Sequence, residues 1–231
     1  MLDDVVSTLQ RLADVLQAER TLGVALASIA EAATTSVPGC DAATIAISIA
    51  GRPATAAMTG IVALELDMVQ YDHEDGPCLT SFHTANALRL DLYEQGEAFP
   101  HVASAAQRLG VRGVLSTPAS WGSETVATLN LYSRTGPFDA SAETVAAVLA
   151  AQVAIAVSRS PEFAAARAVV EGAQRDTDDQ AQISLATGML IGSQDCTREQ
   201  AEALLRHAAA HDEQTILQIA RRIIEQHHNT R

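Results

Sequence analysis

The spacing of apolar residues changes twice along this chain of 231 residues, and these changes limit the folds that it can adopt. Residues 2–19 and 22–36 carry apolar side chains three or four positions apart, which is the spacing of an amphipathic helix. The next hundred residues contain short β-like runs, and helical spacing returns from Ser141. The pattern therefore predicts a mixed domain in the middle of the chain with helices on both sides.

The middle region predicts an α+β fold built on an antiparallel sheet, because pairs of strands alternate with helices. Turns at Gly51-Arg52-Pro53 and Gly122-Ser123 would close two hairpins. The expected strands are 43–49, 54–59, 88–92, 113–119 and 126–133, and the expected helices are 61–70 and 101–109.

The helical region after Ser141 divides at Pro161, which removes a backbone donor and should break or bend a helix. A further helix is expected over 162–174, followed by the polar stretch 175–179. Three short helices are then predicted. Thr197 and Gln200 would form a capping box at the start of the second, and Asp212 would cap the third. Gly188 would allow two helices to approach closely.

Composition excludes several kinds of chemistry. All 15 basic residues are arginine, so a Schiff-base lysine and a phosphate-loop lysine are both ruled out. The net charge is −13, and from Asp178 onward eight acidic residues still outnumber five arginines. This balance is unusual for a protein that binds nucleic acid.

Three widely spaced cysteines and the lack of a signal-like N-terminus predict a reduced cytoplasmic protein without disulfides. No membrane span is expected, since no apolar run approaches 18 residues. Cys78 follows Gly76-Pro77, where a helix should begin. The helix dipole could make its thiol redox-responsive, or Cys78 could be a buried structural residue. No metal site is expected at His73, and no nucleophile–base pair predicts catalysis.

The middle region resembles the GAF family over most of residues 20–160. The resemblance is carried by Val37-Pro38-Gly39-Cys40-Asp41, Gln70-Tyr71, Gly76-Pro77-Cys78-Leu79, Asp91, Gly110-Val111-Arg112, Leu129-Asn130-Leu131-Tyr132 and Phe138-Asp139. It implies a sensor domain that holds a small ligand between the sheet and its covering loops, although the fold does not name the ligand or any cofactor.

The C-terminal region resembles the ANTAR domain, a small three-helix module that binds paired RNA hairpins in bacterial antitermination. The matching segments are Ile183 to Ile191, Thr197 to Ala201, Leu204-Leu205-Arg206 and Ile216 to Ile224. The resemblance implies that RNA would be contacted by exposed basic residues of this region. The candidates are Arg198, Arg206, His207, His211, Arg221 and Arg222.

The chain departs from the ANTAR pattern over 209–214, where Asp212 and Glu213 stand in place of polar and basic residues. Two carboxylates beside a phosphate backbone would weaken RNA binding. The order of motifs is most similar to that of actinobacterial GAF–ANTAR regulators.

The sequence therefore predicts a dimeric, non-enzymatic cytoplasmic regulator in which a GAF sensor controls RNA binding. The alternative is a signalling or protein-interaction module whose ANTAR unit has weakened or lost RNA binding. The predicted boundaries are an N-terminal helix over 1–19, the GAF domain over 20–160, a connector over 161–177 and the ANTAR domain over 178–231.

Overall fold

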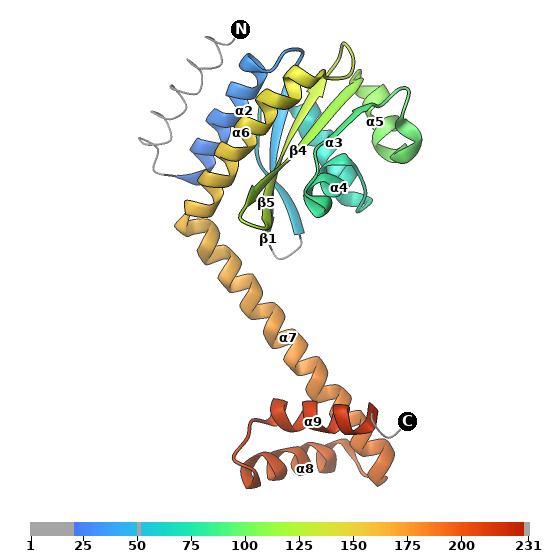
Figure 1. The fold of residues 1–231 in the computed structure, drawn as a ribbon. Coiled ribbons are helices and arrows are strands. Elements are labelled where there is room, and N and C mark those ends of the chain that lie inside the picture. Colours follow the sequence, from blue (N-terminus) through green and yellow to red (C-terminus); the bar gives the residue numbers. More distant parts are fainter. Residues whose placement is uncertain (1–20, 50–51, 229–231) are drawn as a thin grey trace. The chain divides into compact units, whose positions relative to one another are not determined.

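The computed structural model describes residues 21–49 and 52–228, so the helix predicted over 2–19 lies outside the described residues. The chain divides into two compact units, Met1–Arg167 and Ala168–Arg231. The first contains the sheet, and the second consists of helices (Figure 1).

A five-stranded antiparallel sheet forms the centre of the first unit, which confirms the predicted α+β class (Figure 1). Across the sheet the strands are β2 (Arg52–Met58), β1 (Ala42–Ile49), β5 (Glu124–Ser133), β4 (Gly113–Trp121) and β3 (Leu88–Asp91). Trp121 pairs with Glu124, so Gly122 and Ser123 form the predicted two-residue turn. Gly122 has φ +63°, a left-handed conformation that glycine adopts without a steric cost.

Helices α2 (Leu22–Ser36) and α6 (Ala140–Arg159) cover one face of the sheet (Figure 1). Leu26, Leu129 and Leu149 lie in the apolar core between them. By length and composition, α6 is apolar enough to cross a membrane, but its buried side chains pack in this core. It starts one residue before the predicted start. Its cap is Asp139, which accepts a hydrogen bond from the Ala142 N–H at 2.8 Å.

Helices α3 (Ile61–Asp72), α4 (Pro77–Thr84) and α5 (Pro100–Leu109) lie on the opposite face of the sheet. A short 3₁₀ helix, η1 (Gly96–Ala98), which the sequence did not predict, precedes α5. The apolar core on this face is smaller and is built around Leu66, Leu92 and Val114. Buried polar side chains also lie on this face of the sheet, so its two faces differ in character.

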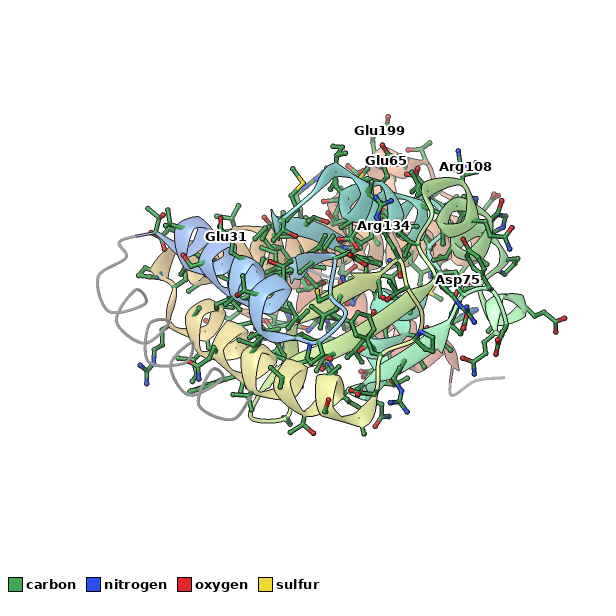
Figure 2. All side chains as sticks on the ribbon, turned by 90° about the horizontal axis from the view of Figure 1, so that it is seen from above. Glu31, Glu65, Asp75, Arg108, Arg134 and Glu199 are labelled. Atoms are coloured by element: carbon green, nitrogen blue, oxygen red, sulfur yellow. The ribbon has the colours of Figure 1, made fainter. Side chains whose placement is uncertain are left out.

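Charged side chains of the first unit lie mainly at its surface. Figure 2 labels Glu31 on α2, Glu65 on α3, and Arg108 and Arg134, and all four are exposed. Asp67 and Asp91 are the exceptions among the described acidic residues of this unit, because both are buried.

Helix α7 (Pro161–Gln194) corrects the prediction for the connector. The break at Pro161 is present, because α6 ends at Arg159 and Pro161 is the first residue of α7. The polar stretch 175–179 does not interrupt α7, however. It contains neither glycine nor proline, and Arg175 and Thr177 donate side-chain hydrogen bonds to backbone carbonyls four residues earlier. The first of the three predicted short helices is therefore the last part of α7.

The second unit packs the end of α7 against α8 (Arg198–His211) and α9 (Ile216–His228). Leu205, Ala209 and Ile219 are buried at its centre. The predicted capping box of Thr197 and Gln200 is confirmed. Leu205 is buried, whereas its neighbour Leu204 has an exposed fraction of 48%.

Two other predictions for this unit were wrong. Asp212 ends α8 and does not cap α9. Thr215 takes that role: its hydroxyl accepts from the Gln218 N–H at 3.2 Å, while Gln218 accepts from the Thr215 N–H at 2.8 Å. At Gly188 an added Cβ would meet no atom within 4 Å, so no close helix contact requires glycine there.

Candidate functional site

A cluster of buried polar side chains lies between the sheet and helices α3 and α4. Asp67 and Gln70 from α3 meet Asn130 and Tyr132 from β5, with Thr44 beside them on β1. None of the five is more than 1% exposed. On β5 these residues alternate with Leu129 and Leu131, which enter the apolar core on the other face, so strand periodicity places the polar set together.

Asp67 is the centre of this polar cluster. The Tyr132 hydroxyl donates to its Oδ1 at 2.6 Å, and the Thr55 hydroxyl donates to its Oδ2 at 2.7 Å. Burial raises the pKa of Asp67, and these hydrogen bonds oppose that effect only in part. No basic side chain among the described residues contributes to the shift.

Gln70 connects the polar cluster to the start of α4. Its Oε1 accepts the backbone N–H of Cys78 at 2.8 Å, and its Nε2 donates to the Tyr132 hydroxyl at 3.3 Å. A Cβ at Gly76 would lie 2.4 Å from Gln70 Oε1, and the φ of Gly76 is +150°. The Gly76-Pro77-Cys78 segment thus permits the contact between Gln70 on α3 and the start of α4.

Cys78 occupies the first turn of α4, as expected, but its side chain is only 1% exposed. Burial, together with the charge of Asp67, raises the pKa of its thiol to about 12. Its Sγ accepts a hydrogen bond from Asn130 Nδ2 at 3.2 Å. The helix dipole therefore does not produce a low-pKa thiol here, and a ligand or redox role for Cys78 stays a prediction.

A pocket of about 20 Å³ opens beside Cys78. A volume of this size accommodates about one water molecule. Thr128, which lines it, has a buried hydroxyl without a hydrogen-bond partner among the described residues, and so have Ser116 Oγ and Asn130 Oδ1 outside the lining. The residues that line the pocket are Ala46, Ile47, Ser48, Pro53, Cys78, Leu79, Phe82, His83 and Thr128.

His73, weighed as a metal ligand from the sequence, lies on the surface at the end of α3. Its Nδ1 is 2.9 Å from the Val69 carbonyl, and its ring stacks on that of His101 at 3.8 Å between centroids. Within residues 21–49 and 52–228, no group of three or more His, Cys, Asp or Glu side chains could hold a metal ion.

Sequence reasoning missed Asp67, Thr55 and the role of Asn130. A usable signal was present, because Asp67 shares a helical stripe with Ala63, Leu66 and Gln70, which are all buried. A carboxylate at a position where the pattern requires an apolar residue indicates either a buried site or a structural network.

The six predicted RNA-contacting residues lie on two helices of the second unit, and all six are exposed. Helix α8 carries Arg198, Arg206, His207 and His211, and α9 carries Arg221 and Arg222. Their side chains contact neighbouring carboxylates, and these carboxylates link some of them in pairs.

Every one of the four arginines in this group is paired within the second unit. Glu202 lies between Arg198 and Arg206, at 3.0 Å and 3.8 Å. Arg222 donates to Asp212, which also contacts His211, and Arg221 contacts Asp179 at 3.3 Å. The charges that would attract RNA are therefore partly neutralised within the unit.

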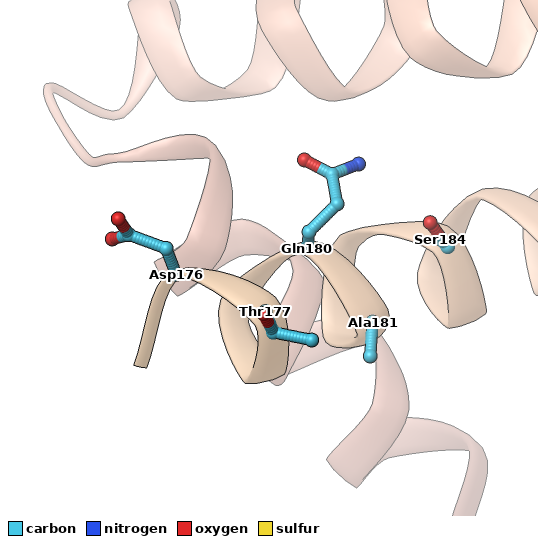
Figure 3. A pocket seen from close by; sticks show the side chains of 5 residues that line it. All are labelled: Asp176, Thr177, Gln180, Ala181 and Ser184. Atoms are coloured by element: carbon cyan, nitrogen blue, oxygen red, sulfur yellow. The ribbon is translucent and has the colours of Figure 1, made fainter. Parts of the chain in front are cut away.

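A shallow hollow of about 480 Å³ lies along α7 in this unit. It is lined only by α7 side chains, which are Asp176, Thr177, Gln180, Ala181 and Ser184, as Figure 3 shows. Because all of them come from one helix, the hollow does not enclose a ligand.

Comparison with solved structures places the first unit among known GAF folds. A GAF domain of a phosphoenolpyruvate-protein phosphotransferase from Coxiella burnetii matches with a TM-score of 0.56 and 18% identity, covering 70% of this chain and 97% of that one. The corresponding domain from Acinetobacter matches with a TM-score of 0.51 and 17% identity, covering 71% of this chain and 95% of that one. At these identities the likeness shows the fold alone.

A transcription factor of the LuxR family that depends on N-acylhomoserine lactone, CepR2 from Burkholderia cenocepacia, matches with a TM-score of 0.52 and 18% identity, covering 67% of this chain and 93% of that one. A comparison with curated proteins gave no match. Family models match residues 5–157 as a GAF domain and residues 171–224 as an ANTAR domain. The chain therefore belongs to the GAF family and carries an ANTAR domain at its C-terminal end.

Proposed function

We propose that this protein is a signal-responsive regulator in which the GAF domain senses a small ligand and controls an ANTAR domain that binds RNA hairpins to regulate transcription antitermination. The observation that carries the proposal is the occurrence of the two family matches in this order on one chain. The similarity to actinobacterial regulators of this organisation remains a prediction from the motifs.

The pocket beside Cys78 supports the sensing half of the proposal. The unpartnered hydroxyl of Thr128, which lines the pocket beside Cys78, offers a polar contact to a small molecule that enters there. The ligand's identity does not follow from this contact. The protein acts as a non-enzymatic cytoplasmic regulator in this proposal.

Exposed arginines on α8 and α9 support the RNA-binding half. A guanidinium can donate two hydrogen bonds to a phosphate and can also stack on an unpaired base. A homodimer would raise the effective concentration of the second ANTAR domain once the first had bound one hairpin. Binding to an RNA of two tandem hairpins would then exceed binding to one hairpin.

The test is a gel-shift titration of the full chain with an RNA that carries two tandem hairpins, at low salt. A single hairpin and a duplex of equal length are the controls, and light scattering reports the oligomeric state. Binding that prefers the tandem RNA supports the proposal. Absence of binding at the lowest salt contradicts it.

A second function, a signalling or protein-interaction module without RNA binding, is favoured by one observation. All four arginines of the predicted surface are already paired with carboxylates. For this function, replacing Asp212 and Glu213 by Asn and Arg would create RNA binding that the unmodified chain lacks.

A further inference from the structure

We infer that Glu202, Asp212 and Asp179 are built-in competitors that occupy the phosphate-binding arginines of the ANTAR domain until RNA displaces them. This inference rests on the proposed function and adds a means of regulating it. Its basis is the pairing of all four arginines of the predicted surface.

The first competitor lies in the middle of α8. Arg198, Glu202 and Arg206 follow one another at intervals of four residues, so their side chains share one stripe of the helix. Glu202 Oε1 accepts from Arg198 Nε at 3.0 Å, and Oε2 lies 3.8 Å from an Arg206 guanidinium nitrogen. One carboxylate therefore uses its two oxygens on two guanidinium groups, as a phosphate with two free oxygens would do.

The second competitor joins α8 to α9. Asp212 ends α8 and accepts from the Arg222 guanidinium through Oδ2, while Oδ1 lies 2.9 Å from His211 Nδ1. The bonds from His211 and Arg222 hold the pKa of Asp212 below its usual range, so it is a carboxylate at neutral pH.

The third competitor, Asp179, comes from α7. Arg221 donates to its Oδ1 at 3.3 Å and to the side chain of Gln182 at 2.7 Å. Asp179 and Asp212 therefore each pair with an arginine of a different helix, whereas Glu202 pairs with arginines of its own helix, α8.

These pairs are suited to competition because they are at the surface. The four arginine side chains are 43–71% exposed, and exposed ion pairs are weak and open readily. A phosphate backbone can therefore replace the carboxylate. The displaced carboxylate remains close by, however, and its repulsion lowers the affinity.

The experiment compares Glu202→Gln and Asp212→Asn with two variants that remove the same charge from neighbouring positions. Glu199→Gln lies on α8, one turn from Glu202, and Glu213→Gln is adjacent to Asp212. All four variants have the same net charge, so long-range electrostatics cancel in the comparison. Circular dichroism checks that each variant is folded.

Binding to the tandem-hairpin RNA is measured from about 50 to 200 mM salt. Glu202→Gln, which frees two arginines, should bind about 3- to 10-fold more tightly than Glu199→Gln. Asp212→Asn should bind about 2- to 5-fold more tightly than Glu213→Gln. Equal affinities in each matched pair would overturn the inference.

A second measurement separates failure of this inference from failure of the proposed function. Heparin is a polyanion that needs no hairpin recognition, so retention on heparin reports the availability of the arginines alone. If no variant binds the RNA, the proposed function fails. Later elution of Glu202→Gln and Asp212→Asn than of their controls would still support competition, and co-elution would refute it.

Discussion

The hydroxyl of Tyr132 on β5 donates a hydrogen bond of 2.6 Å to the carboxyl of Asp67 on α3, at a place where both side chains are buried. This bond joins the sheet to a covering helix through a titratable group. The stability of the GAF domain is therefore linked to pH.

Replacing Asp67 by Asn should weaken the pH dependence of unfolding. Burial raises the pKa of Asp67, so above about pH 4 the unfolded chain releases a proton that the folded chain keeps. The free energy of unfolding of the unmodified protein then falls as pH rises towards the folded pKa, by at most about 1.4 kcal/mol per pH unit. Urea titrations between about pH 4 and 8, followed by the fluorescence of Trp121, would measure it. Asp72→Asn on the exposed end of α3 is the control, and identical pH profiles for the Asp67→Asn variant and the unmodified protein would contradict the prediction.

Cys78 should be protected from thiol reagents in the folded protein. Its thiol is 1% exposed, and burial raises its pKa to about 12, so the reactive thiolate is scarce. Maleimide labelling with mass spectrometry should find Cys78 unmodified while Cys196, which is partly exposed, reacts. Urea should abolish the difference. Labelling of Cys78 at the rate seen in the unfolded chain would instead favour a reactive cysteine.

Replacing Gly76 by Ala should destabilise the GAF domain by about 2 to 5 kcal/mol. The new Cβ would overlap Gln70, whose Oε1 lies 2.4 Å from its position, and the φ of +150° strains any other residue. Gly122→Ala is the matched control, since its Cβ meets no atom within 4 Å, and only the left-handed backbone should cost about 1 to 2 kcal/mol. Equal losses in the two variants, measured by urea unfolding, would show that the Gln70 contact is unimportant.

Thr215→Ala should lower the stability of the second unit by about 0.5 to 2 kcal/mol, because it removes the cap of α9. Thr215→Ser keeps the hydroxyl and should restore most of the loss. Thermal melts followed by far-ultraviolet circular dichroism would measure both. If Thr215→Ala has no effect while Asp212→Ala reduces stability, Asp212 is the effective cap after all.

The secondary structure was predictable because local rules determine most of it. The strands, the break at Pro161 and the capping box of Thr197 follow from periodicity, backbone chemistry and a short motif. The continuity of α7 could not be predicted in this way, because a polar stretch is compatible both with a loop and with an exposed helix. Only the absence of glycine and proline over 175–179 favoured the helix.

The candidate sites were harder to predict, because they depend on which side chains meet. Several residues that carry the GAF resemblance have structural contacts: Asp91 accepts from Arg112 at 2.8 Å, and Asp139 caps α6. Asp67, the centre of the buried cluster, belongs to none of the motifs. On α8 and α9 the exposed arginines were foreseen, but their carboxylate partners come from other turns and other helices, which a linear sequence does not bring together.

The pocket beside Cys78 has a consequence for how the GAF domain would respond to a signal. At about 20 Å³, it is far smaller than a metabolite. An effector that enters here would have to displace the side chains that line the pocket. Three of these, Cys78, Leu79 and Phe82, belong to α4. Binding of the effector and displacement of α4 would then occur together. The free energy needed to open the pocket would set the lowest affinity at which an effector can act.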